Sequence, residues 1–282
     1  MPTPSKADAS ESGRHGRRPG SGDGAPRRFR ATVEYDGTDF AGFQAQRRGV
    51  RTVQGELETA LASLSDGVRQ AVDGAGRTDA GVHALGQVIG FTYPGRLSAA
   101  ELEPALNGRL PPDVAVREVR TAPSGFHPRR AARYREYRYT VWNGPRSPLR
   151  ERTALGVRAP LDVAAMARAG QALEGRHDFS AFGATKNRQP VRTVHSVRVR
   201  RQGSFVTIDV RAESFLRGMV RRIAAVLVEV GRGKMNETEI RAALADRQPA
   251  RNGATAPAKG LCLRRVVLGR RPEATDDADG DN

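Results

Sequence analysis

The sequence of 282 residues predicts an α+β protein built from two ferredoxin-like halves. Segments with strand alternation and segments with helical spacing occur in the order β-α-β-β-α-β over residues 29–130, and the same order recurs over 131–271. The hydrophobic content of 38% is enough to form a core in each half. We therefore expect a mixed, mostly antiparallel sheet with helices on one side and a central cleft lined by basic residues.

The first half contains two expected helices and several strands. The first helix covers 52–64, where apolar residues recur at helical spacing before a Ser-Asp-Gly turn. The second runs to Leu110 from a capping box formed by Ser98 and Glu101. The strands show alternating or continuous apolar residues, and they are expected at 29–35, 68–75, 81–93 and 114–120.

The second half repeats this order. Its expected strands are 135–142, the two arms of a hairpin at 191–212 that turns near Gln202-Gly203-Ser204, and 261–268. Asp162 is the expected cap of a helix that Gly175 ends, and a helix with an apolar stripe is expected at about 215–230. Asn236, with Glu239 three residues later, caps a further helix.

The two ends of the chain have the composition of disordered segments. Residues 1–28 form a basic extension rich in Pro, Gly, Ser and Arg, and residues 272–282 form an acidic tail. The formal net charge of the whole chain is +16, and residues 31–271 taken alone carry about +17, because the two ends together carry −1. A folded region with this charge predicts a polyanionic partner, and charge alone does not distinguish RNA from DNA.

The sequence argues against several classes of protein. Its longest apolar runs, such as residues 224–230, are too short to cross a bilayer, which predicts a soluble, cytoplasmic protein without membrane contact. Cys262 has no second cysteine to pair with, and the five histidines show no metal-ligand spacing. GAGRTD lacks the remaining residues of a dinucleotide or P-loop motif. We therefore expect neither a metal nor a nucleotide cofactor.

The stretch GAGRTDAG, residues 74–81, carries the most informative acid. Asp79 lies between two expected strands, where a loop can present a side chain to a cleft, and Arg77 is close enough in sequence to keep it ionised. The alternative is a tight turn in which Asp79 bonds its own backbone. His83, four residues later, lies in a strand pattern, so we expect it to be structural.

Two further stretches combine arginine with apolar or aromatic residues. In RYREYRYTVW, Tyr137 faces one side of a strand and has Arg135 and Arg138 nearby, a combination that stacks on a base and holds phosphates. The alternative is an ordinary core strand. In SFLRGMVRRIAAVLVEVG, Arg217, Arg221 and Arg222 cluster in the first turns of the expected helix, and an arginine turned toward the core there would need a carboxylate partner.

Several stretches in register resemble the TruA family of tRNA pseudouridine synthases over nearly all of residues 29–268. They are VEYDGTDFAGFQAQ with TVQGELETAL, GRTDAGVHALGQV, FHPRRAARYREYRY, DFSAF with VRTV, and FLRGMVRRI with KGLCL. Phe43 departs from the family pattern, which usually has Trp at this position.

The resemblance implies a role for each matched position. Asp79 falls on the catalytic aspartate, Arg77 on the arginine of the same motif, and Tyr137 on the tyrosine that stacks against the target base. Arg221 falls on the arginine that pairs with the aspartate, and Leu261 on a leucine of the uracil pocket. It also implies a homodimer that isomerises uridines at positions 38 to 40 of the tRNA anticodon arm, without metal or cofactor.

Such a reaction leaves two routes open for Asp79. The carboxylate either attacks C1′ of the ribose or removes a proton from C2′, and both routes require its charged form, held by Arg221 or Arg77. A non-catalytic RNA-binding or ribosome-associated protein is the alternative, because the same sheet and arginines would serve it. A carboxylate-dependent nuclease is disfavoured, since its metal would need clustered acids.

Overall fold

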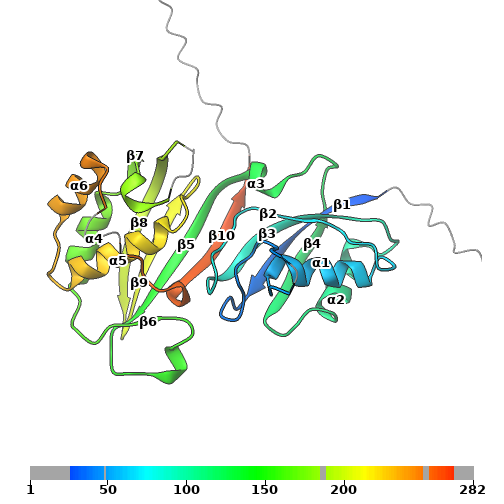
Figure 1. Ribbon diagram of the computed structural model, residues 1–282, viewed down its shortest axis with the longest axis horizontal. Helices are drawn as coiled ribbons and strands as arrows, with labels where there is room; N and C mark the ends of the chain where they lie inside the picture. Colours follow the sequence, from blue (N-terminus) through cyan, green and yellow to red (C-terminus); the bar gives the residue numbers. More distant parts are fainter. Residues whose placement is uncertain (1–25, 48, 185–188, 250–253, 270–282) are drawn as a thin grey trace, which may run out of the picture.

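The strands of both halves join in one continuous sheet, which runs the length of the molecule (Figure 1). The computed structural model describes residues 26–47, 49–184, 189–249 and 254–269. The acidic tail and most of the basic extension lie outside these residues. Strand β1 (Arg27–Tyr35) begins two residues before the expected strand. It does so because Arg28 pairs with Asp73 at 2.6 Å, while Arg27 donates hydrogen bonds to two carbonyls of another loop. The folded part therefore includes the last two residues of the expected extension.

The first half contains the expected order of elements. After β1 come α1 (Val53–Ser63), β2 (Val72–Gly74), β3 (His83–Tyr93), α2 (Ala99–Asn107) and β4 (Val114–Thr121). The expected capping box is present, since Ser98 and Glu101 each bond the other's backbone. The strand expected at 68–75 is shorter, because a turn after α1 delays its start until Val72.

The second half contains the expected elements in the expected order, but the end of one helix and the start of another differ from the prediction. It contains α3 (Pro128–Ala131), β5 (Ala132–Trp142), β6 (Leu155–Gly156), α4 (Val163–Gln171), β7 (Gly175–Asp178), β8 (Val191–Gln202), β9 (Phe205–Ala212), α5 (Met219–Gly231), α6 (Glu237–Asp246) and β10 (Leu261–Leu268). Gly218 has a φ of 73°, which α-helix does not allow, so α5 begins at Met219 and not at 215. Gly175 opens β7, four residues beyond the end of α4, and does not cap that helix.

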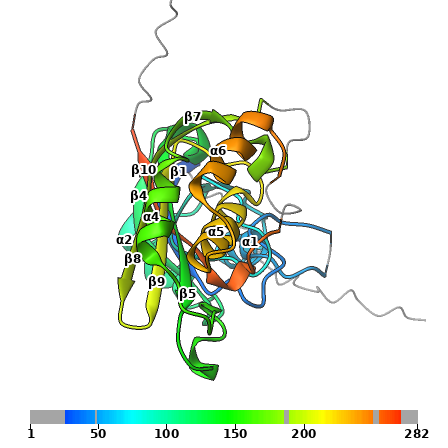
Figure 2. The same cartoon turned by 90° about the vertical axis from the view of Figure 1, so that its left-hand side faces the viewer.

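The strand order confirms the ferredoxin-like repeat. Along the sheet it is β4-β1-β3-β10-β5-β9-β8-β7, with β2 on β3 and β6 on β5. Within the first half the order is β4-β1-β3-β2, and within the second it is β10-β5-β9-β8. In each half the fourth of these strands along the chain is followed by the first, the third and the second. The halves meet where β10 lies next to β3. Alternate residues of β1 and of β9 are buried, so one face of the sheet packs into the core. Helices α4 and α5 pack together on this face in the second half (Figure 2).

One edge of β3 is shared between two partners. Its C-terminal part, Ile89–Phe91, pairs with β2, whereas its first residues, His83 and Ala84, pair in parallel with β10. The chain from β2 back to β3 must therefore pass through the place where β10 enters the sheet. Residues 75–82, which contain all of the GAGRTDAG motif except its first glycine, are this connection.

The core confirms the apolar stripe expected in α5. Met219 and Ile223 are fully buried, and Val226 and Val230 are nearly so. No helix in the described part of the chain is long and apolar enough to span a membrane.

Replacing Leu263 with alanine should destabilise the join between the halves. Leu263 of β10 is fully buried and lies opposite Ala84 on one neighbouring strand and Tyr137 on the other. We expect the free energy of unfolding to fall by about 2–5 kcal/mol in urea titrations followed by circular dichroism. The control is Leu149→Ala, at a side chain that is 89% exposed, which should change the value by about 0.5 kcal/mol or less. Equal effects of the two variants would contradict this role for β10.

Candidate active site

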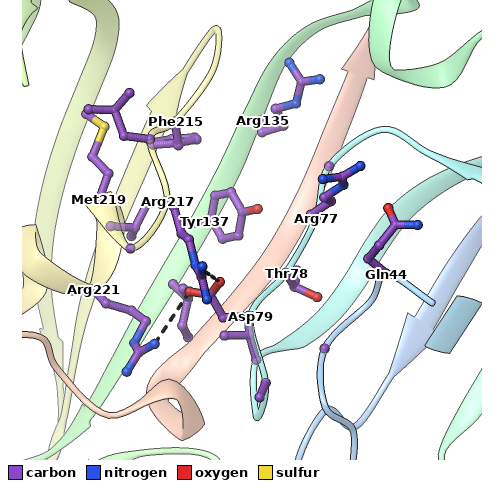
Figure 3. A pocket seen from close by; sticks show the side chains of 18 of the residues that line it. Gln44, Arg77, Thr78, Asp79, Arg135, Tyr137, Phe215, Arg217, Met219 and Arg221 are labelled. Carbon is purple, nitrogen blue, oxygen red and sulfur yellow. Dashed lines mark ion pairs between the residues drawn. The ribbon is translucent and has the colours of Figure 1, made fainter. Parts of the chain in front are cut away.

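The loop between β2 and β3 forms one wall of a cavity of about 490 Å³ at the junction of the two halves. Residues 214–221, which lead into α5, form the facing wall, and the sheet supplies side chains from β5 and β10 (Figure 3). Among the described residues that line the cavity, Asp79 is the one acidic side chain. The basic ones are Arg77, Arg129, Arg135, Arg217 and Arg221. The cavity is therefore strongly basic around one carboxylate.

Arg135 ties this loop to the second half of the protein. Its side chain is almost fully buried and donates to the carbonyl oxygens of Ala75 and Glu213, each at 2.6 Å. Ala75 lines one wall of the cavity and Glu213 directly precedes the facing wall, so one guanidinium ties the two walls together. The sequence suggested phosphate binding for Arg135, but its donors are used on backbone carbonyls.

Further hydrogen bonds fix the loop on the side of the first half. Gln87 donates to the carbonyl of Gly76 at 2.8 Å, and the amide of Phe43 donates to the carbonyl of Thr78 at 3.1 Å. The hydroxyl groups of Thr78 and Tyr35 also bond each other at 2.8 Å. Asp79 thus follows a stretch of backbone whose position is set from several directions.

The glycines of the motif permit close contacts. A Cβ atom on Gly74 would lie 2.4 Å from the ring of Phe43, closer than two carbon atoms can approach. A Cβ atom on Gly76 would lie 3.9 Å from the Tyr137 hydroxyl and would reduce the cavity. The first glycine is therefore required by packing, and the second keeps space open.

Two arginines lie beside the Asp79 carboxylate. Arg217 Nε is 3.6 Å from Oδ1 and Arg221 is 3.6 Å from Oδ2 (Figure 3). The Arg221 side chain is 22% exposed and also donates to the carbonyl of Ala256 at 2.7 Å, whereas that of Arg217 is 83% exposed. Arg221 is thus the more firmly held of the two. The family resemblance matched only Arg221 to a partner of Asp79, whereas Arg217 also reaches the carboxylate from the turn before α5.

Arg77, the other partner considered for Asp79, lies apart from the carboxylate. It is exposed, and among the described residues it makes no ion pair with Asp79. Figure 3 shows its guanidinium on the side of the cavity opposite Met219 and Arg221. Arg77 is therefore placed at the mouth of the cavity, where it can meet an incoming anion.

Tyr137 and Leu261 supply the apolar part of the cavity. Both are buried, and Phe215 packs edge-on against the Tyr137 ring with centroids 5.2 Å apart. Arg138, which the sequence placed near Tyr137, lies on the opposite face of the sheet and forms two hydrogen bonds with Asp209. It therefore does not hold a phosphate beside Tyr137.

Histidine and acidic side chains do not form a metal site in the described part of the chain. His83 is nearly buried; its Nδ1 accepts a hydrogen bond from the amide of Gly37, and its Nε2 faces the carbonyls of Arg152 and Lys259. These contacts join the start of β3 to three other segments of the chain. His83 is therefore a structural residue, as the strand pattern suggested.

Comparisons with known proteins agree with this fold and its two halves. A family model described as tRNA pseudouridine synthase matches residues 31–129 and 169–267, one stretch in each half. The chain is 44% identical to tRNA pseudouridine synthase A of Brevibacillus brevis over 86% of its own length and 99% of that protein. It is also 44% identical to the Myxococcus xanthus protein of the same name, over 90% of this chain and 98% of that one. The chain belongs to the tRNA pseudouridine synthase family.

The buried phenol of Tyr137 should make stability depend on pH in the alkaline range. Burial is the main cause that raises the pKa of Tyr137 to about 12; Arg135 opposes the shift and Asp79 adds to it. Because an unfolded tyrosine ionises near pH 10, the stability that Tyr137 contributes is complete below about pH 10 and is lost as the pH rises toward 12.

The test is to measure the free energy of unfolding at pH 9 and pH 11 for the wild type and for Tyr137→Phe. The wild type should lose more stability between the two pH values, by on the order of 1 kcal/mol. The same loss in both proteins would contradict the shift.

Proposed function

We propose that this chain isomerises uridine to pseudouridine in tRNA, with Asp79 as the catalytic residue. The observation that carries the proposal is one carboxylate in a basic cavity, between Arg221 and the aromatic ring of Tyr137. Membership of the family and the names of the relatives support the same reaction and the same class of substrate.

The reaction breaks the bond between C1′ and N1 of uridine and forms one between C1′ and C5. The proton leaves C5 and N1 gains one, so the change needs no net oxidation, reduction or hydrolysis. Asp79 acts either by attacking C1′ or by taking the proton of C2′. Each route uses the ionised carboxylate, and Arg221 and Arg217 supply its two cationic neighbours, each 3.6 Å away.

The remaining residues of the cavity hold the substrate. Tyr137 and Leu261 form the wall against which the detached uracil turns before it bonds again through C5. Arg77 at the mouth of the cavity binds the RNA backbone. The target nucleotide must leave the helical stack, at a cost of a few kcal/mol, and contacts between these arginines and phosphates offset that cost.

The finer assignments extend the family resemblance. The substrate is the anticodon arm, with uridines at positions 38 to 40, and the enzyme acts on cytoplasmic tRNA as a homodimer. Sequencing of pseudouridine in tRNA from cells that lack the gene would locate the targets, and sedimentation equilibrium would give the number of subunits.

Asp79→Asn should abolish pseudouridine formation and leave the affinity for tRNA within about twofold, because the amide keeps the size of the carboxylate and loses its charge. The measurement is tritium release from tRNA that carries C5-labelled uridine, together with filter binding of the same tRNA. Release at the wild-type rate by the variant would sink the assignment. Binding without release by the wild type would instead favour a non-catalytic RNA-binding protein.

The two arginines beside Asp79 should contribute unequally. Arg221→Gln removes a largely buried charge partner, and we expect kcat to fall by on the order of 10²-fold. Arg217→Gln removes an exposed partner, so kcat should fall by about fivefold or less. Single-turnover rates at saturating enzyme would separate these effects from binding. A larger loss from Arg217→Gln would reverse the ranking that exposure gives.

A further inference from the structure

A second cavity, of about 210 Å³, adjoins the candidate active site on the side of the first half. It shares with the active site the side chains of Gln44, Arg77 and Arg129 and the backbone of Gly76. The two cavities therefore meet at a partition that carries two arginines. The roles assigned above to Asp79, Tyr137, Arg221 and Leu261 leave this second cavity unused.

Its inner wall contains a glutamine whose orientation is fully determined. Gln54 is 8% exposed, and its amide group donates to the Glu58 carboxylate at 2.8 Å and to the Val72 carbonyl at 3.1 Å. Because an ionised carboxylate and a carbonyl only accept, the other end of Gln54 must be its oxygen. That oxygen accepts from Gln44 Nε2 at 2.6 Å and from the amide of Ala45 at 2.8 Å.

The same chain of bonds orients Gln44. Glu58 is nearly buried and is itself held by Arg69 and by the backbone amide of Val72, so the chain of bonds starts from a fixed point. Gln44 donates one N–H to Gln54, which fixes the orientation of its amide group and leaves its carbonyl oxygen available as an acceptor, beside the second N–H. No described residue donates to that oxygen, and Gln44 lies across the cavity from Phe215 and Arg221 (Figure 3).

The rim and the far wall add charge and a second polar side chain. Arg77 and Arg129 are exposed at the partition, and the carboxylate of Asp73 is already paired with Arg28 at 2.6 Å. The Nδ1 atom of His127, which lines the cavity, is buried without a hydrogen-bond partner among the described residues. Because this atom is closed off from the cavity, His127 contributes a polar side chain to the wall and its Nδ1 does not itself meet a ligand.

We infer that this cavity binds the base of the nucleotide next to the target uridine, and that Gln44 accepts a hydrogen bond from the N–H edge of that base. Adjacent nucleotides are joined by one phosphate, and the partition between the cavities places Arg77 and Arg129 where that phosphate passes. Gln54 and Glu58 are positioning residues for Gln44. The inference rests on the proposed function.

The test combines an enzyme variant with a substrate variant. Full-length tRNA carrying C5-tritiated uridine at the target is assembled with an abasic nucleotide on its 5′ side or on its 3′ side. We expect kcat/KM of the wild type to fall about tenfold for one of these two substrates. Gln44→Met keeps the length of the side chain and removes the acceptor. Its kcat/KM on intact tRNA should be about tenfold below that of the wild type. On the abasic tRNA that the wild type uses poorly, the variant should be little worse than the wild type, because the base that Gln44 would bind is already missing. Gln171→Met, an exposed change at the end of α4, should behave as the wild type does on every substrate.

The outcomes separate the two proposals. The base-binding cavity is supported if the losses in kcat/KM from Gln44→Met and from the abasic nucleotide are not additive, and if this holds for only one of the two abasic positions. Additive losses, or full activity of the wild type on both abasic substrates, would overturn this cavity and leave the proposed function standing. Because the abasic substrates are tested with the wild type, this holds even if Gln44→Met folds poorly. Absence of tritium release from intact tRNA would overturn the proposed function and the cavity together.

Discussion

The shared edge of β3 is the constraint on which the site depends. A strand edge bonds one neighbour at a time, so β3 can accept β10 only where β2 has left it. The change of partner opens the sheet, and the chain between β2 and β3 must turn there. Asp79 lies on this turn, and Leu261, the first residue of β10, arrives at the same place. The strand pairing that joins the two halves therefore also forms the cavity.

Arg135 fixes the distance between the two sides of this opening. Its guanidinium is buried and bonds carbonyls on both walls, so moving the walls apart would leave charge and carbonyls without partners. The glutamine and glutamate chain in the first half acts in the same manner on Gln44. In both cases a buried charged group, held by several bonds, fixes the position of groups at the cavity walls. Arg77, by contrast, is an exposed side chain at the cavity.

Local patterns were sufficient for most of the fold. Alternation, helical spacing and the capping boxes at Ser98 and Asn236 predicted the order of elements, because each depends on residues a few positions apart. The errors arose where distant contacts decide. Arg28 extends β1 through its pair with Asp73, and Arg217 pairs with Asp79 of the distant loop between β2 and β3. The positions of Asp79, Tyr137 and Arg221 came from family resemblance, since local residues left each of them ambiguous.

The sequence by itself determined the two repeated α+β halves, the strong positive charge of the folded region and the residue types available for chemistry. It did so because composition and periodicity are local properties of the chain. Only the tertiary structure decided that Arg217 joins Arg221 beside Asp79, that Arg135 bonds backbone instead of phosphate, and that Gln44 presents its oxygen. Each of these depends on hydrogen-bond geometry between segments far apart in the chain, and spacing in the sequence does not encode that geometry.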